Sequence, residues 1–133
     1  MFEELIDLTS SFLVGFRNIT KRHSLTSSQG LIIMTIDIDG SSMTFLSKKM
    51  GLDASTMTRN IEKLEKKQLV FRQRLSSDAR VINVYLTELG KRTYKSLKEE
   101  LDIYFGDKIT NRSEVSDKLQ GLIWDSEKIN NIK

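Results

Sequence analysis

The chain has 133 residues, 38% of them hydrophobic and 29% charged, with a net charge of +3, no Pro and no Cys. That length suits one domain with its own core, this composition excludes an intrinsically disordered chain, and the lack of Cys excludes disulfide scaffolds, thiolate zinc sites and thiol-based redox sensing. No apolar run approaches the roughly 20 residues of a membrane span, so we expect a soluble cytoplasmic protein with no membrane partner.

Two helices are predicted in the N-terminal part. Apolar residues recur at spacings of three and four over residues 2–19, which is the pattern of one helix with a wide apolar face. Thr26 and Gln29 then form a capping box, because the side chain of each can satisfy a free backbone donor of the other. We expect this second helix to run toward Ile38 and to break at Gly40.

Two short helices with a sharp turn between them follow. Thr44 is expected to cap the first, which ends at Gly51, and Asp53 is expected to cap the second, which covers 54–67. One residue separates Gly51 from Asp53, so the spacing predicts a helix-turn-helix. In the second helix the apolar residues fall on one stripe, at steps of three, four and three. They are Ala54, Met57, Ile61 and Leu64.

The opposite face of the 54–67 helix carries short hydroxyl groups at its start and longer donors one turn later. A helix of this kind can approach a DNA groove closely and still reach the base edges. A merely solvated face normally carries Glu and Lys pairs, which appear here only from Glu62 onward. The polar-face residues are Ser55, Thr56, Thr58, Arg59, Asn60 and Lys63.

A β-hairpin and two closing helices complete the chain. Runs at 69–75 and 81–86 favour strands and flank a turn-rich segment, which predicts a hairpin directly behind the helix-turn-helix and hence a winged helix. Apolar stripes predict one helix after a Thr87 cap and another over 115–129. Together with the helix over 2–19, these two helices have more apolar surface than a single small domain can bury. We therefore expect a second copy of the chain to cover it in a dimer. The predicted class is mainly α with a small β-hairpin wing (α+β).

Basic residues are concentrated in the middle of the chain. Between Lys48 and Lys98 there are 13 Lys or Arg and 5 Asp or Glu, a balance of +8, whereas the remaining residues include 8 and 13, a balance of −5. A basic block between acidic flanks is typical of a region that binds a polyanion, and a chance grouping of solvated charges is the alternative.

The sequence offers no group of residues that would carry catalysis. It has no Cys, a single His, no glycine-rich phosphate loop and no G-x-S-x-G or H-E-x-x-H motif, so we expect no enzyme, no cofactor and no metal site. The Ser pairs at 10–11, 27–28 and 41–42 are interpreted as turns and caps, and His23 as a solvated residue at a helix end.

Three segments carry a resemblance to a known family. They are Leu25-Thr26 with Gln29; Ser55-Thr56-Met57-Thr58-Arg59 with Ile61, Leu64-Glu65 and Leu69-Val70; and Asp78-Ala79-Arg80 with Val84, Leu86-Thr87 and Gly90. In this order and at these separations, they resemble the second helix, the recognition helix and the D-x-R…L-T-x-x-G wing signature of MarR-family transcriptional regulators. Two positions depart from the family pattern: Gln68 replaces a common Gly, and Ala79 replaces a frequently basic wing-tip residue.

The resemblance implies one MarR-like domain over 1–133, with a DNA-binding lobe at about 26–87 and dimerisation helices at about 1–22 and 88–133. It implies a transcriptional regulator, expected to be a repressor, that acts as a homodimer on a pseudo-palindromic double-stranded DNA operator. A winged-helix architectural or protein-adapter module without an effector is the alternative function.

The resemblance also implies roles for individual residues. The polar face of the 54–67 helix would face the major groove, and Arg80 would reach the minor groove or its phosphates. Asp78 would hold the wing by pairing with Arg72 or Arg74, and solvent-facing strand positions are the alternative for these two arginines. Phosphate contacts are assigned to Lys48, Lys49 and Lys67.

Family members often release DNA when a small molecule occupies the crevice between the dimerisation helices and the DNA-binding lobe. A packed core is the alternative for an apolar stripe of this kind, and the sequence identifies no effector. The candidate crevice residues are Phe12, Phe16, Ile33, Met34, Tyr94 and Leu97.

Overall fold

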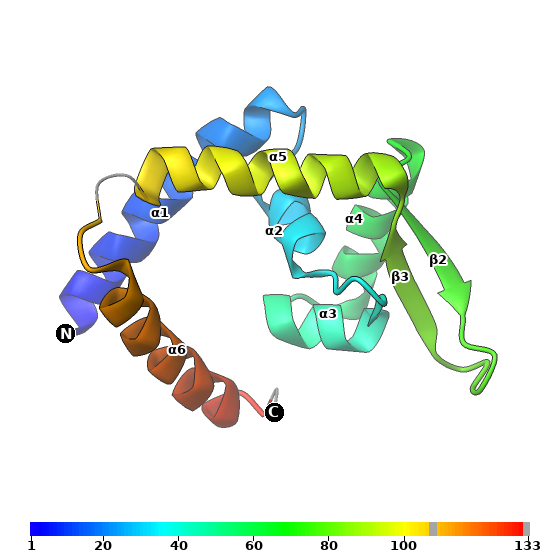
Figure 1. Ribbon diagram of the computed structural model, residues 1–133. Helices are drawn as coiled ribbons and strands as arrows, with labels where there is room; N and C mark the ends of the chain where they lie inside the picture. The colour runs from blue at the N-terminus through cyan, green and yellow to red at the C-terminus, as the bar shows by residue number, and fades with distance from the viewer. Residues whose placement is uncertain (107–108, 132–133) are drawn as a thin grey trace.

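The structure, a computed structural model that describes residues 1–106 and 109–131, consists of helices around a small antiparallel sheet. The elements are α1 (Phe2–Arg22), α2 (Ser27–Thr35), β1 (Ser41–Ser42), α3 (Met43–Met50), α4 (Ala54–Lys66), β2 (Val70–Arg74), β3 (Ile82–Leu86), α5 (Glu88–Phe105) and α6 (Arg112–Ile129). In Figure 1, α5 runs from the wing at one end of the molecule to α1 at the other, where α6 turns back. The predicted class, mainly α with a small wing, is confirmed. None of the described helices is long and apolar enough to cross a membrane.

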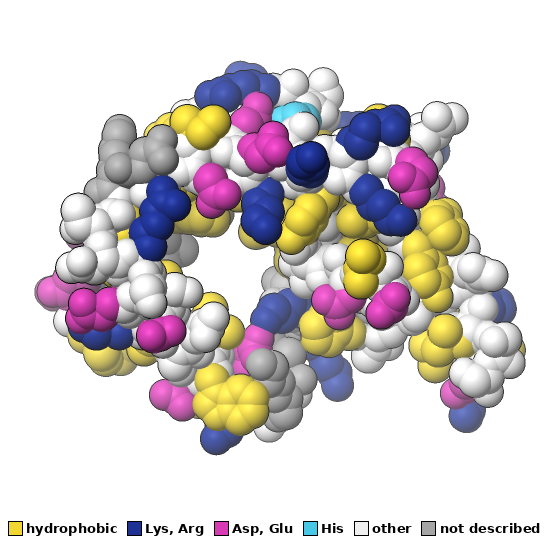
Figure 2. Space-filling model, viewed as in Figure 1, with side chains coloured by type: hydrophobic (Ala, Val, Ile, Leu, Met, Phe, Trp, Pro, Cys, Tyr) yellow, Lys and Arg dark blue, Asp and Glu magenta, His cyan; other side chains and the backbone are white. Residues whose placement is uncertain are grey.

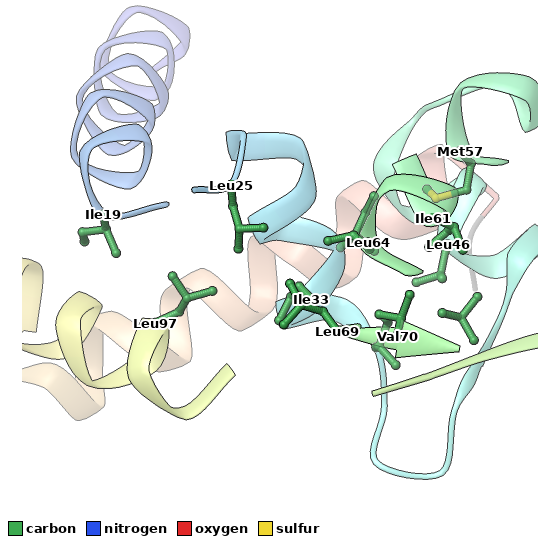
Figure 3. Packing of buried hydrophobic residues seen from close by; sticks show 13 residues of the cluster. Ile19, Leu25, Ile33, Leu46, Met57, Ile61, Leu64, Leu69, Val70 and Leu97 are labelled. Carbon is green, nitrogen blue, oxygen red and sulfur yellow. The ribbon is translucent and has the colours of Figure 1, made fainter. Parts of the chain in front are cut away.

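One cluster of buried side chains joins α1 through α5 to the wing strands (Figure 3). On α4, Met57, Ile61 and Leu64 are fully buried, as their spacing predicts, and each such side chain contributes roughly 1.5–3 kcal/mol. Ala54, the first member of the predicted stripe, is exposed in the first turn. The cluster fixes α4 by one face and leaves the opposite face outward. Its members are Ile19, Leu25, Ile32, Ile33, Ile36, Leu46, Met57, Ile61, Leu64, Leu69, Val70, Val84 and Leu97.

Three of the predicted helix starts have side-chain caps. The Gln29 N–H donates to Thr26 Oγ1 over 3.1 Å and the Thr26 N–H donates to Gln29 Oε1 over 3.2 Å, which completes the predicted capping box of α2. Asp53 caps α4 by accepting the Thr56 N–H over 2.7 Å, and Thr87 caps α5. Each cap satisfies a backbone donor that the helix leaves free and contributes about 1 kcal/mol.

The second helix is shorter than predicted. It ends at Thr35 rather than near Ile38, because Ile36 takes an extended backbone with ψ 123°. The Asp37 N–H then donates to Ser41 Oγ over 3.0 Å instead of to a carbonyl of the helix. Strong apolar character continued past the end of the helix, so hydrophobicity alone placed its boundary too late.

The sheet contains a third strand, β1, that the sequence does not predict. Ser41 pairs with Val84 in antiparallel register, which gives the strand order β1-β3-β2. A two-residue strand is too short to show an alternating pattern, so only the tertiary fold reveals it.

Two smaller predictions about serine and threonine residues are wrong. Ser42 rather than Thr44 caps α3, accepting a backbone N–H over 3.0 Å. The Ser pair at 10–11 lies within α1 and forms no turn.

The end of α4, the start of β2 and the start of α5 meet at one point. Gln68 takes a left-handed conformation with φ 62°, which costs a residue with a side chain about 1 kcal/mol relative to Gly. Its carbonyl accepts the Thr87 hydroxyl over 2.6 Å, and the Leu69 carbonyl accepts the Thr87 N–H over 3.0 Å. Thr87 Oγ1 also accepts the Gly90 N–H over 3.0 Å. A Cβ on Gly90 would lie 2.0 Å from the Leu69 oxygen, so no other residue fits there without displacing the backbone.

We therefore expect Gly90→Ala to lower the free energy of unfolding by about 1–3 kcal/mol, since the new methyl group collides with backbone rather than with a movable side chain. Gly121→Ala is the matched control, because a Cβ at that position on α6 meets nothing within 4 Å. It should raise the free energy of unfolding by up to about 1 kcal/mol through better helix propensity. Urea denaturation followed by circular dichroism measures both, and effects of the same sign would contradict the account of Gly90.

Candidate nucleic-acid interface

Helices α3 and α4 form the predicted helix-turn-helix, and local backbone geometry sets the turn between them. Gly51 ends α3 with φ 64°, a left-handed conformation that glycine adopts without strain. The Leu52 N–H donates back to the Ser47 carbonyl over 3.0 Å, and Asp53 then begins α4. This turn leaves the start of α4 exposed.

Hydrogen bonds within α4 orient its polar face. Ser55 Oγ donates to Asp53 Oδ1 over 3.0 Å, and Arg59 Nη2 donates to Thr56 Oγ1 over 3.3 Å. Asn60 Nδ2 donates to the Thr56 carbonyl over 3.2 Å, so its amide turns back toward the helix instead of outward. The exposed members of the predicted set are Ser55, Arg59 and Lys63, and the half-buried members are Thr56, Thr58 and Asn60.

The three lysines assigned to phosphate contacts lie in different surroundings. Lys48 is exposed in the last turn of α3. Lys49 forms an ion pair with Glu127 of α6, which brings α6 against the helix-turn-helix. In Figure 2 a hollow lies between α6 and the rest of the chain on this face. Lys67 lies at the end of α4 opposite the Asp53 cap, and its ammonium group donates to the Ser24 carbonyl. Lys48 is therefore the member of the three whose ammonium group forms neither an ion pair nor a hydrogen bond within the described residues.

The wing is held differently from the prediction that Asp78 pairs with Arg72 or Arg74. Asp78 pairs instead with Arg80, whose Nε lies 3.1 Å from Oδ1, because the tight turn brings these residues together. Hydrogen bonds from the Arg80 side chain and backbone hold the pKa of Asp78 below its ordinary value. Arg72 pairs with Glu65 of α4 at 2.7 Å, and Arg74 donates to the Ala79 carbonyl over 2.7 Å. Both arginines thus fasten the wing, one to α4 and one across its own tip.

The residues predicted to line an effector crevice do not form one cavity in the described chain. Phe16, Ile33 and Leu97 are at most 1% exposed and belong to the packed interior. Met34 and Tyr94 line a cavity of about 460 Å³ between the end of α2 and the start of α5. Phe12 lies in a separate groove between α1, α5 and α6. Helical spacing identified an apolar face correctly, but it could not distinguish core from cavity wall.

Two contacts that position the interface are not predicted by the sequence. Glu65 connects α4 to the wing through Arg72, and nothing in its charged neighbourhood singles it out beforehand. His23 was interpreted as solvated, but its Nε2 lies 3.0 Å from Glu100 Oε2, so it connects the end of α1 to α5. Both contacts join residues from different elements, which local patterns do not reveal.

Comparisons with known proteins agree with this arrangement. The MarR family model matches residues 25–82. The HTH-type transcriptional regulator SarZ of Staphylococcus aureus is 32% identical over 108 residues, which cover 80% of this chain and 73% of SarZ. The transcriptional regulator BldR from Sulfolobus solfataricus has a similar solved structure, with a TM-score of 0.81 and 23% identity, covering 93% of this chain and 92% of that one. A variant of S. aureus MepR, solved with an oligodeoxyribonucleotide, has a TM-score of 0.63 and 17% identity, covering 96% and 97%.

The Asp53 cap makes the start of α4 sensitive to acid. The Thr56 N–H, followed by the hydroxyls of Thr56 and Ser55, lowers the pKa of Asp53 from its ordinary value of 3.8. Because the pKa is lower in the folded chain, the stability that the ionised cap contributes is fully present above the ordinary pKa of the unfolded chain. It is lost as pH falls through the pKa of the folded chain. We expect the Thr56 amide NMR signal to titrate with a midpoint below 3.8. Asp53→Asn keeps an acceptor and should abolish this titration, and a midpoint at or above the ordinary value would contradict the cap.

Proposed function

Since this chain belongs to the MarR family of DNA-binding transcriptional regulators, which are not enzymes, we propose that it is a cytoplasmic repressor that recognises one double-stranded DNA sequence as a homodimer. The observation that carries this proposal is the setting of α4. Three fully buried apolar side chains hold one face of the helix. The opposite face carries hydroxyl groups in the first turn, next to the Asp53 cap, and the exposed Arg59 one turn later. The MepR variant, which shares this fold, was solved with a bound oligodeoxyribonucleotide, and this supports DNA binding as the use of the fold here.

The proposal divides the interface into reading and anchoring groups. Ser55 and Thr56 are short enough to let the start of α4 enter the major groove, while Arg59 can donate two parallel hydrogen bonds to a guanine edge. Lys48, at the end of α3, supplies a phosphate contact that adds affinity without sequence preference. Arg80 is 90% exposed at the wing tip and is proposed to contact a neighbouring groove or its phosphates.

A second copy of the chain is the proposed partner of the exposed apolar helices. On α6, five large apolar side chains are each 37–55% exposed, and a groove of about 750 Å³ between α1, α5 and α6 is mostly apolar. Patches of this extent on a small protein are typical of interaction surfaces, and a two-fold dimer would present two α4 helices to a pseudo-palindrome. The five are Val115, Leu119, Leu122, Ile123 and Trp124.

An effector is proposed to act through the cavity that Met34 and Tyr94 share. Its volume of about 460 Å³ falls within the range of small-molecule sites, roughly 300–1,000 Å³. It lies between the end of α2 and the start of α5, so a ligand there would act on the junction between the wing and α5.

The division of roles is tested by fluorescence-polarisation binding to duplexes from upstream of the gene, with random duplex as competitor. Arg59→Ala should reduce the preference for the operator by about 1–3 kcal/mol, because a base contact is lost. Lys48→Ala should weaken all duplexes alike and reduce the slope of log affinity against log salt by about one unit. Identical behaviour of the two variants would contradict the division.

The same assay separates a specific regulator from an architectural module. A specific regulator stays bound to its operator in the presence of competitor, because its affinity for the operator exceeds that for random duplex by roughly 10³ or more. An architectural protein binds both duplexes with a ratio of affinities near one. A ratio near one for the unmodified chain would overturn the proposed function in favour of the architectural alternative.

Dimerisation is tested by sedimentation velocity. Leu119→Lys places a charge on the α6 face beside the groove and should shift the chain to a monomer, because burying an unpaired ammonium costs several kcal/mol. Ile38→Lys is the matched control, since Ile38 is 86% exposed in the turn before β1 and lies outside the groove between α1, α5 and α6. A Leu119→Lys chain that sediments like the unmodified protein would show that this face is not the interface.

A further inference from the structure

A second cavity lies on the side of α4 away from its N-terminal turn. It has a volume of about 500 Å³ and is open to solvent, with walls from the end of α1, the start of α2 and the end of α4. At 1.5 Å per residue, Lys67 lies about 18 Å along the helix axis from Ser55. The cavity therefore lies beyond the proposed base-reading residues Ser55, Thr56 and Arg59, although Lys63 belongs both to its lining and to the predicted polar face of α4. Its lining residues are Lys21, Ser24, Leu25, Thr26, Gln29, Lys63, Lys66 and Lys67.

The charge of this cavity is of one sign. Four of its eight lining residues are lysines and none is acidic. Two acidic residues of α4 lie close by in the chain: Glu65 pairs with Arg72, and Glu62 is exposed beside Lys63 without lining the cavity. Among the described residues, Lys21, Lys63 and Lys66 form no ion pair within 4.0 Å. Like charges gathered around one hollow repel each other, and an anion in that hollow would relieve the repulsion.

A nearly buried polar side chain adds donors to the same cavity. Gln29 is only 4% exposed, and its Oε1 is occupied by the Thr26 N–H of the capping box. The capping box fixes which end of the amide is the acceptor, so the Nε2 group, with two N–H donors, is left on the other side. Within the described residues no protein acceptor lies in hydrogen-bond range of Nε2. Among the described residues Gln29 Nε2 is not a buried atom without a partner, so it reaches solvent, and because its residue lines the lysine cavity it is available to donate to an anion there.

We propose that this cavity binds a small multivalent anion that carries phosphoryl groups. Lysine ammonium groups from α1 and α4 provide the charge, and the Gln29 amide provides a directed donor to one anionic oxygen. The ligand is a free solute, because the cavity lies away from the exposed start of α4. Lys21 and Lys66 come from different helices, so the bound anion would join the end of α4 to α1.

The proposal is tested by isothermal titration calorimetry with orthophosphate, pyrophosphate and tripolyphosphate, at constant ionic strength and without DNA. We expect one site per chain and an affinity that rises with the charge of the anion. The double variant Lys21→Gln/Lys66→Gln should lose affinity for tripolyphosphate by about tenfold or more, since two of four cationic groups are removed. Gln29→Glu keeps the acceptor that caps α2 and should also lose affinity, because it replaces the donor with a negative charge.

The matched control is Lys95→Gln/Lys98→Gln, which makes the same change in net charge at exposed positions of α5 outside the cavity. It should keep its affinity within about twofold, because screened charges at a distance contribute little. Equal losses in the two double variants, or no saturable heat for the unmodified chain, would overturn the site. If Lys21→Gln/Lys66→Gln instead left tripolyphosphate binding unchanged and weakened duplex DNA with a smaller salt slope, the lysines would serve DNA phosphates, and the free-solute proposal would be wrong.

Discussion

The arrangement of the DNA-binding region depends on the contact between Gly90 and the Leu69 carbonyl. The first turn of α5 reaches the backbone where α4 passes into the wing, and only the absence of a side chain at position 90 allows that approach. Thr87 closes the contact from both sides, donating to the Gln68 carbonyl and accepting the Gly90 N–H. Three elements are thereby joined through their backbones, so α4, the wing and α5 must move as one unit. The left-handed backbone of Gln68 is tolerated because these neighbours hold it.

Features governed by near neighbours in the chain were predictable. The caps at Thr26, Asp53 and Thr87 depend on residues within three positions, and the buried face of α4 follows from helical periodicity, so the fold class and the helix-turn-helix could be derived from the sequence. The same reasoning located the polar face of α4. It could not show that Asn60 turns its amide back onto the helix, because a choice of rotamer leaves no mark in the sequence pattern.

Features that depend on distant parts of the chain were not predictable. Lys49 and Glu127 are 78 positions apart, and their pairing exists only because α6 folds back toward α3. Arg72 was a candidate partner for Asp78, but it pairs with Glu65 of α4 instead, a contact that depends on how the wing packs against α4. Phe16, Ile33 and Leu97 illustrate the same limit in the interior, because an apolar residue at helical spacing suits a packed core and a ligand cavity equally well.

The pairing of Asp78 with Arg80 at the wing tip changes what DNA binding by the wing would involve. An unpaired arginine would simply add a contact, whereas this guanidinium already has a carboxylate partner, so a phosphate must share it or displace it. Binding through the tip is then an exchange of one anion for another, and its net enthalpy is the difference between two similar contacts. The wing would accordingly contribute orientation more than strength, since a paired tip holds its arginine in a defined place before any nucleic acid arrives.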